Sequence, residues 1–467
     1  MSIDNRHLMP KWYPVEEAAL ETDSYGLAHP DWIKSLIMAE ACVNTASTDG
    51  TFAGMTRVLE HCAEMGVNGL WLTPIYDQAD GRSSYTNFGP HTVSRQFTGT
   101  ENYEEGWKVV KRFIDEAHKR NIRVFLDIII YGSSVDSPLM KEHPEWYEGG
   151  WPAHAGHTWV WKHPGFIEFY VNAACSVIEK TGADGFRVDL EPDITGYWMF
   201  ETIRKRLYEQ GKYIAIFTEL RSEREQAYDF DENSVGLDLT TPLNEWGCPV
   251  NEDDTMYYFI RNNIVDCCKT GRGIGSLAKQ QQGESGQYRY YTFCLSNHDF
   301  WHYVTHKDLI TFGYQMIFSP FLPLWFIGEE WDNPRTPGRG GVLFWNDIEW
   351  DALEANREFF EAVKAMIRIR REHPEIFTYF PDNHRDANIC KVQANTPLQA
   401  YARYAEGKTV LILPNSTDET LTVTALRPDV ATGDTVCELF QGQNLQADSE
   451  SVTVTVPPHT MSIVLIK

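Results

Sequence analysis

Short apolar runs alternate with longer amphipathic segments along the chain from about residue 32. The amphipathic segments repeat their apolar positions with the period of a helix. Examples are FAGMTRVLEHCAEMG, which ends at Gly66, and the stretch from residue 103 to 121. The apolar runs between them have the length of buried strands. Alternation of this kind is typical of repeated strand–helix units that build a parallel sheet.

Eight runs carry this strand pattern. They cover residues 35–43, 68–76, 122–130, 185–190, 213–220, 235–239, 291–299 and 323–330. Eight strands with helices between them predict a closed α/β fold, the (β/α)8 TIM barrel.

Two segments depart from the strand–helix alternation. Residues 131–165 are rich in Trp, Gly, His and Pro without clear periodicity, which predicts a functional insertion after the third strand. Beyond residue 380 the chain changes to short alternating strands, which predict a C-terminal all-β sandwich. We therefore expect the barrel at 1–130 and 166–380, the insertion at 131–165, and the sandwich at 381–467.

The charge balance narrows the class of ligand. Asp and Glu total 66 against 41 Lys and Arg, a net charge of −25, which would repel nucleic acid and anionic lipid and favours neutral ligands. No tract is apolar enough to span a bilayer and no secretory signal is visible, so we expect a cytoplasmic protein. Nine cysteines without a CxxC spacing indicate neither a zinc site nor a disulfide framework. No feature of the sequence indicates an oligomeric state.

Polar residues at the ends of the apolar runs are the candidates for chemistry, because the active site of a parallel barrel lies at the carboxyl ends of its strands. These residues are Asp127, Arg187, Asp189, Glu219, Asn297, His298 and Asp299. Residues two apart in a strand point to the same face, so Arg187 and Asp189 should both face inward. The Arg187 charge then favours the ionised form of the Asp189 carboxyl.

Carboxylates that converge on one barrel mouth suit cleavage of a glycosidic bond. That reaction needs one ionised carboxylate at the anomeric carbon and one protonated carboxyl at the leaving oxygen. Asp189 beside Arg187 is the natural nucleophile, and Glu219, after the apolar run IAIF, is the natural general acid. The alternative is a set of ion pairs that lock the rim of the barrel.

The segments that carry these residues resemble the conserved blocks of the α-amylase superfamily of retaining (β/α)8-barrel glycoside hydrolases. The blocks are VFLD, GFRVD, FTE and SNHD, and the resemblance runs from about Leu36 to Phe377. It implies roles for six residues at the barrel mouth. These are Asp189 as nucleophile, Glu219 as acid/base, Asp299 as transition-state stabiliser, Arg187 and His298 in the subsite of the reacting sugar, and Asp127 as their buttress.

The chain departs from the family pattern after two of these blocks. Tyr131 and Gly132 stand where the family carries an Asn that usually binds calcium and a His that usually contacts the sugar, and Pro192 and Asp193 replace a Lys-His pair. We therefore expect remodelled subsites, no calcium and no other cofactor. The acidic residues of the insertion are more typical of solvated surface than of a calcium site. They are Asp136, Glu142, Glu145 and Glu148.

Aromatic residues near the predicted mouth are candidates for stacking on sugar rings. They are Tyr131, Trp151, Trp159, Trp161 and Trp301. For each of them the alternative is packing of a loop against the barrel. Three histidines of the insertion lack the spacing of a metal motif, so no metal site is expected there. They are His154, His157 and His163.

Three functional hypotheses follow from the sequence. The first is a retaining hydrolase of α-glucosidic bonds in malto-oligosaccharides or related α-glucans, with a neutral oligosaccharide as its partner. The second keeps the covalent intermediate but passes the sugar to another acceptor, as a transglycosylase or a phosphorylase does. The third is a non-catalytic sugar-binding relative that has kept the barrel.

Overall fold

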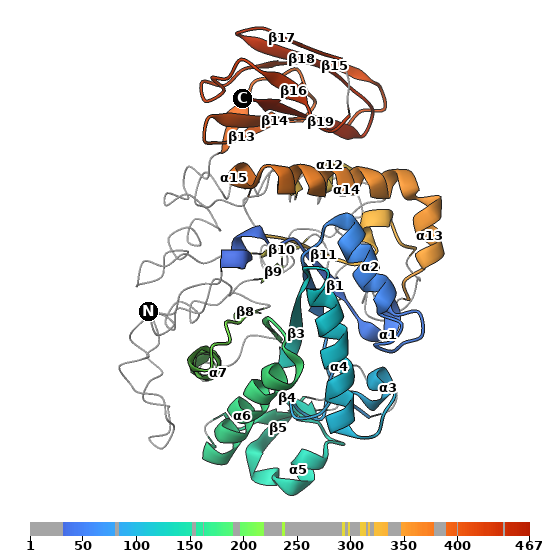
Figure 1. Cartoon of the computed structure of the whole chain (residues 1–467), viewed down its shortest axis with the longest axis vertical. Coiled ribbons are helices and arrows are strands. Elements are labelled where there is room, and N and C mark those ends of the chain that lie inside the picture. The colour runs from blue at the N-terminus through green and yellow to red at the C-terminus, as the bar shows by residue number, and fades with distance from the viewer. Residues whose placement is uncertain are drawn as a thin grey trace. The chain divides into compact units, whose positions relative to one another are not determined.

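The chain divides into two compact units, which are described separately. The computed structural model describes residues 31–79, 84–151, 156–161, 163–189, 197–218, 236–238, 292–294, 298, 309–313, 316–317, 322–334, 347–377, 389–398, 400–441 and 444–467 (Figure 1). The first unit comprises residues 1–241, 280–294 and 344–348, and the second comprises 242–279, 295–343 and 349–467.

Parallel strands form the centre of the first unit. Five of them pair in the order β8-β7-β3-β2-β1. They are β1 (Met38–Ala41), β2 (Gly69–Leu72), β3 (Arg123–Ile129), β7 (Gly185–Asp189) and β8 (Ala215–Thr218). Two shorter strands, β9 (Gly236–Asp238) and β10 (Thr292–Cys294), also pair in parallel. Each of these seven strands lies within one of the predicted apolar runs, which confirms the parallel α/β pattern.

Helices follow the strands of the first unit, as the amphipathic segments predict (Figure 1). The longer ones are α2 (Thr56–Met65), α4 (Tyr103–His118), α6 (Pro164–Thr181) and α7 (Tyr197–Glu209), and the one-turn elements are η4 (Asp31–Ser35), α1 (Val43–Ala46) and α3 (Arg95–Thr98). Helix α2 ends where the sequence predicts, because Gly66 adopts the left-handed conformation at φ 85°. None of the helices in the described ranges is long and apolar enough to cross a membrane.

The insertion after β3 has a small sheet of its own rather than an irregular course. Its strands β4 (Gly132–Ser134), β6 (Gly156–Trp159) and β5 (Tyr147–Trp151) pair antiparallel in that order. Helix α5 (Pro138–Glu142) and the single turn η5 (Pro144–Trp146) connect β4 to β5. Strands of three to five residues are too short to show a periodic pattern in the sequence, which is why only an aperiodic insertion was predicted.

The second unit contains the last predicted barrel strand and the helices before and after it. They are β11 (Leu322–Phe326), η8 (Glu329–Trp331), α12 (Leu309–Gly313), α13 (Trp350–Ala355), α14 (Arg357–Glu372) and α15 (Pro374–Phe377). The buried guanidinium of Arg370 in α14 donates to the carbonyl oxygens of Met316 and Phe377 at 2.7 and 3.0 Å. Burial lowers the pKa of Arg370 to about 9, and the nearby Arg403 charge adds to this effect. Arg403 is also buried, and its Nη2 donates to the carbonyl oxygen of Ile376 at 2.7 Å.

The C-terminal part of the second unit is an antiparallel sandwich. One sheet has the order β12-β13-β14-β19-β16 and the other β15-β18-β17. Their bounds are Ile389–Val392, Ala400–Ala405, Lys408–Asn415, Thr460–Ile466 and Val436–Glu438 for the first sheet, and Leu421–Leu426, Ser451–Val456 and Leu445–Ala447 for the second. Side chains such as Leu411 and Leu413 of one sheet share a buried core with Val423 and Val454 of the other. The structure thus confirms the predicted all-β sandwich.

A glycine permits the close approach of β7 and β8. A Cβ on Gly185 would lie 1.7 Å from the carbonyl oxygen of Ala215, a backbone atom that cannot move without breaking the strand pairing. We expect Gly185→Ala to lower the free energy of unfolding by about 1–3 kcal/mol or more, as overpacking does. Gly150→Ala is the matched control, since the nearest atom to its Cβ would be 3.9 Å away. Equal thermal unfolding midpoints of the two variants, measured by circular dichroism, would contradict this account.

Candidate active site

Strands β3 and β7 bring three charged residues of the predicted site together. In their parallel register Asp127 lies opposite Arg187, and Ile129 lies opposite Asp189. Because Arg187 and Asp189 are two apart, they share one face of the strand, as expected from the sequence. All three side chains are buried, with exposed fractions of 0% for Asp127, 2% for Arg187 and 5% for Asp189.

The Arg187 guanidinium connects the two carboxylates. Its Nη1 donates to Asp189 Oδ1 at 2.8 Å and to Asp127 Oδ2 and Oδ1 at 3.0 and 3.2 Å. The guanidinium carbon also lies over the Trp71 ring, 4.7 Å from its centroid, which adds a cation–π attraction. A buried cation between two buried anions offsets the cost of removing all three charges from water.

Asp127 is held by donors from three different parts of the chain. Besides Arg187, its Oδ2 accepts from Trp71 Nε1 of β2 at 3.2 Å and from the Tyr85 hydroxyl at 2.9 Å. Burial, together with the negative charge of Asp127, raises the pKa of Tyr85 well above its usual value, so the hydroxyl keeps its proton and donates. These hydrogen bonds hold Asp127 beside Arg187, as its predicted role of supporting the Arg187–Asp189 pair requires.

The loop that carries Tyr85 is attached to the insertion. The Tyr131 hydroxyl donates to the Tyr85 carbonyl oxygen at 2.5 Å. The Ser134 amide donates to the Asn87 carbonyl at 2.8 Å, and the Ser137 hydroxyl donates to the Phe88 carbonyl, also at 2.8 Å. Because the Tyr131 hydroxyl contacts the Tyr85 backbone, a sugar contact of Tyr131 would have to come from its ring, and that role stays a prediction.

Sequence reasoning did not find Trp71 or Tyr85. Trp71 lies in the predicted strand, and the need of a buried indole N–H for a partner was the signal that could have identified it. Tyr85 lies in the stretch GRSSYTNFGPH, which has no periodicity, so a single sequence offers no signal for it.

Two tryptophans of the insertion pack into the protein instead of facing a ligand. Trp159 is 0% exposed and Trp161 is 7% exposed. Their rings lie 5.0 and 5.2 Å from the ring of Phe166 in α6, measured between centroids. The stacking role considered for these two residues is therefore wrong, and packing of the insertion against α6 explains them.

Several predicted residues lie where the structure gives less detail. Glu219, Asp299, Trp301, His154, Pro192 and Asp193 lie outside the described residues, as does the side chain of Trp151. His298 is described and buried, and it belongs to the second unit. The geometry therefore joins Asp127, Arg187 and Asp189, and the roles of Glu219, Asp299 and His298 stay predictions.

The residues present do not fit the calcium site of the predicted family. Tyr131 supplies no amide oxygen at the position of the usual Asn ligand, and its hydroxyl contacts Tyr85. The four acidic residues of the insertion, Asp136, Glu142, Glu145 and Glu148, are all exposed. Across the described part of the chain, no group of three or more His, Cys, Asp or Glu side chains is arranged to hold a metal ion.

Arg187 is expected to be essential for folding as well as for the site. Arg187→Met would keep much of the side-chain volume but leave Asp127 and Asp189 buried without their shared cation. We expect the free energy of unfolding to fall by about 3–5 kcal/mol, as happens when one partner of a buried ion pair is removed. Urea unfolding followed by tryptophan fluorescence measures this.

Arg120→Met is the control for this change, because Arg120 pairs with half-exposed Glu116 on the surface of α4. Such pairs contribute about 0–1 kcal/mol. If Arg187→Met destabilised the protein no more than this control, the charge balance described above would be wrong.

Comparison with known proteins agrees with this geometry. A family model described as the alpha amylase catalytic domain matches residues 37–165. A cyclomaltodextrinase from Bacillus sp. is 21% identical over 405 residues, which cover 79% of this chain and 66% of that protein. A trehalose synthase from Thermus thermophilus is 24% identical over 280 residues, which cover 49% of this chain and 26% of that protein. This chain therefore spans only part of the length of these two relatives.

A solved structure gives the fold. The maltogenic alpha-amylase AmyB from Thermotoga neapolitana aligns with a TM-score of 0.67 at 18% sequence identity, covering 93% of this chain and 99% of that one. The likeness confirms the predicted fold, a (β/α)8 barrel with an insertion after the third strand and a C-terminal sandwich. The fold, the matched catalytic segment and the relatives make this chain similar to the α-amylase superfamily of (β/α)8-barrel glycoside hydrolases.

Proposed function

We propose that the protein is a retaining α-glycoside hydrolase that cleaves α-glucosidic bonds in malto-oligosaccharides or related α-glucans. The observation that carries this proposal is the buried Arg187 guanidinium, whose Nη1 lies 2.8 Å from Asp189 Oδ1 and 3.0 Å from Asp127 Oδ2. A carboxylate held this way at the end of a barrel strand meets the requirement for a nucleophile in a retaining glycosidase.

In the first step the Asp189 carboxylate attacks the anomeric carbon of the sugar. The bond from that carbon to the glycosidic oxygen breaks, and the departing oxygen takes the proton of Glu219. The products of this step are a free sugar hydroxyl and a glycosyl ester on Asp189. Arg187 fixes the orientation of the attacking carboxylate through its hydrogen bond to Oδ1.

In the second step a water molecule attacks the same carbon from the face that the leaving group vacated. Glu219, now ionised, takes the proton of this water, and the ester bond to Asp189 breaks. Both carboxyl groups return to their starting protonation states, and the anomeric configuration is retained. The family resemblance assigns Asp299 and His298 to the subsite of the reacting sugar. Stacking on sugar rings is proposed for the Tyr131 ring and Trp301, because they are aromatic residues that follow the third and seventh predicted strands.

The choice of α-glucans as substrates is supported by the names of the relatives and by charge. A cyclomaltodextrinase and a maltogenic amylase are among the similar proteins. The net charge of −25 suits a neutral oligosaccharide better than an anionic one.

Transfer to a second sugar is the alternative outcome of the same intermediate. It is favoured by the partial match to a trehalose synthase. A product profile distinguishes the reactions. Hydrolysis of maltoheptaose, a cyclic maltodextrin, an α-1,6-linked oligosaccharide or sucrose gives only shorter products, transfer gives longer ones, and phosphorolysis gives a sugar phosphate only when phosphate is added.

Replacing the nucleophile tests the proposal directly. We expect Asp189→Asn to lower kcat by about 10⁴-fold or more on every α-glucoside that the native protein cleaves, because an amide cannot form the glycosyl ester. Asp351→Asn removes an exposed carboxylate on α13 and serves as the control. A fluorinated α-glucosyl fluoride should label the native protein at Asp189, which peptide mass spectrometry detects. Unchanged turnover in Asp189→Asn would refute the mechanism.

Metal removal should leave the protein unaffected. Because the donor groups at the usual calcium position do not fit the ion, we expect dialysis against a chelator to change neither kcat nor the thermal unfolding midpoint. The measurement compares the dialysed protein with the same sample after excess calcium is added. A rise in kcat or in the unfolding midpoint on adding calcium would show a calcium site and would contradict this prediction.

A further inference from the structure

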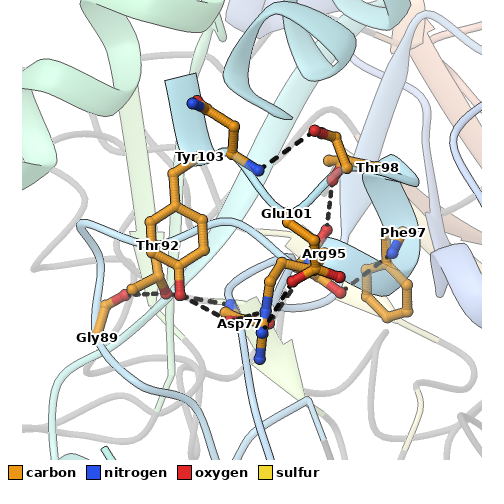
Figure 2. A network of polar contacts seen from close by, with 11 residues as sticks. Asp77, Gly89, Thr92, Arg95, Phe97, Thr98, Glu101 and Tyr103 are labelled. Carbon is orange, nitrogen blue, oxygen red and sulfur yellow. Dashed lines mark hydrogen bonds and ion pairs between the residues drawn. The ribbon is translucent and has the colours of Figure 1, made fainter. Parts of the chain in front are cut away.

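Asp77 lies just after β2, and its nearly buried carboxylate accepts hydrogen bonds from side chains of two helices. It is 3% exposed. Figure 2 shows the Tyr103 hydroxyl of α4 and the Arg95 guanidinium of α3 directed at this carboxylate, with distances to Asp77 Oδ2 of 2.7 and 2.8 Å. The Asp77 charge raises the pKa of Arg95, and burial followed by the Asp77 hydrogen bond raises the pKa of Tyr103. Both groups therefore remain donors to Asp77.

The backbone of Asp77 holds together the described segments 76–79 and 84–89, which we call the 76–89 loop. Its carbonyl accepts from the Phe88 amide at 2.8 Å, and its own amide donates to the Thr92 hydroxyl at 3.1 Å. One position further along, Gln78 and Asn87 form an antiparallel bridge. The carboxylate thus attaches the base of the loop to α3 and α4. The backbone hydrogen bonds of Asp77 extend this attachment to both segments of the loop.

Tyr85 is the connection from the 76–89 loop to the predicted chemistry. Its hydroxyl donates to Asp127 Oδ2, and Asp127 shares Arg187 with Asp189. On the other side, Tyr131 holds the Tyr85 carbonyl. The direction of the Tyr85 hydroxyl therefore depends on two attachments of the loop, one to the insertion and one through Asp77.

We infer that Asp77 is a positioning residue for the reaction proposed above: it fixes the 76–89 loop so that Tyr85 holds Asp127 and, through Arg187, orients the Asp189 carboxylate. This inference rests on the proposed function and adds to it a residue outside the barrel mouth. An amide at this position would remove the negative charge that pairs with the Arg95 guanidinium. With its oxygen in the place of Oδ2, its N–H group would face the Arg95 amide, which donates to Asp77 Oδ1 at 3.4 Å, so the loop base would lose that attachment as well.

A double-mutant cycle tests the inference. The kcat and KM for maltoheptaose are measured for the native protein, Asp77→Asn, Tyr85→Phe and the double variant. We expect each single change to lower kcat by about 10- to 100-fold, because small displacements of reacting groups have effects of that size, while KM changes far less. The double variant should be no slower than Tyr85→Phe alone. Effects that multiply, or an unchanged kcat in Asp77→Asn, would overturn the inference.

Two further variants separate positioning from general stability. Asp115→Asn removes a carboxylate that pairs with Lys111 on the exposed face of α4, the helix that carries Tyr103, and should leave kcat unchanged. Tyr103→Phe removes one hydroxyl from Asp77 without changing any charge, and it replaces Asp77→Asn in the cycle if that variant does not fold. A purely structural role would lower the unfolding midpoint without coupling to Tyr85.

Hydrogen exchange provides a readout that does not require activity. In Asp77→Asn, mass spectrometry should find faster amide exchange in peptides containing Phe88 and in those containing Asp127, with β18 of the sandwich unchanged. If the native protein cleaved no α-glucoside, the proposed function would fail while this experiment still decided the inference. Unchanged exchange around Asp127 would overturn the inference, whatever the activity.

Discussion

One guanidinium group between two buried carboxylates is the interaction on which the candidate site depends. Arg187 and Asp189 are two residues apart in β7, and Asp127 is their neighbour in β3, so the parallel pairing of two strands is sufficient to bring the three charges together. None of these charges would be stable alone in the barrel interior. The geometry of the candidate site and the stability of the sheet therefore depend on the same three charges.

The polar groups around this centre come from three different parts of the chain. Trp71 reaches Asp127 from the adjacent strand, Tyr85 reaches it from a loop, and Tyr131 reaches Tyr85 from the insertion. The donors Trp71 and Tyr85 are buried, and Tyr131 is partly buried. Such contacts are strongly directional in a low-dielectric interior. A set of loops that would otherwise move independently is thereby given one preferred arrangement over the charged centre.

The parts of this arrangement that sequence could predict are those that periodicity controls. Strands β3 and β7 and the inward direction of Arg187 and Asp189 follow from apolar runs and from the two-residue repeat of a strand. Tyr85 could not be predicted, because its position depends on hydrogen bonds between loop segments that have no repeat. For Trp159 the sequence left stacking and packing open, because no periodic pattern shows which way the side chain of an irregular segment points. Contacts with α6 bury it.

The attachment of the 76–89 loop to the insertion bears on how such a protein diversifies. Strand β4 begins at Gly132, only a few residues after Asp127, and its backbone is hydrogen-bonded to Asn87 across the loop. A change of length in either segment would displace the other and, with it, the carboxylate between them. The two segments must therefore be exchanged together. Grafting a new insertion from a relative would require transplanting its matching loop. Recombination that separates them would yield folded barrels with a misaligned centre.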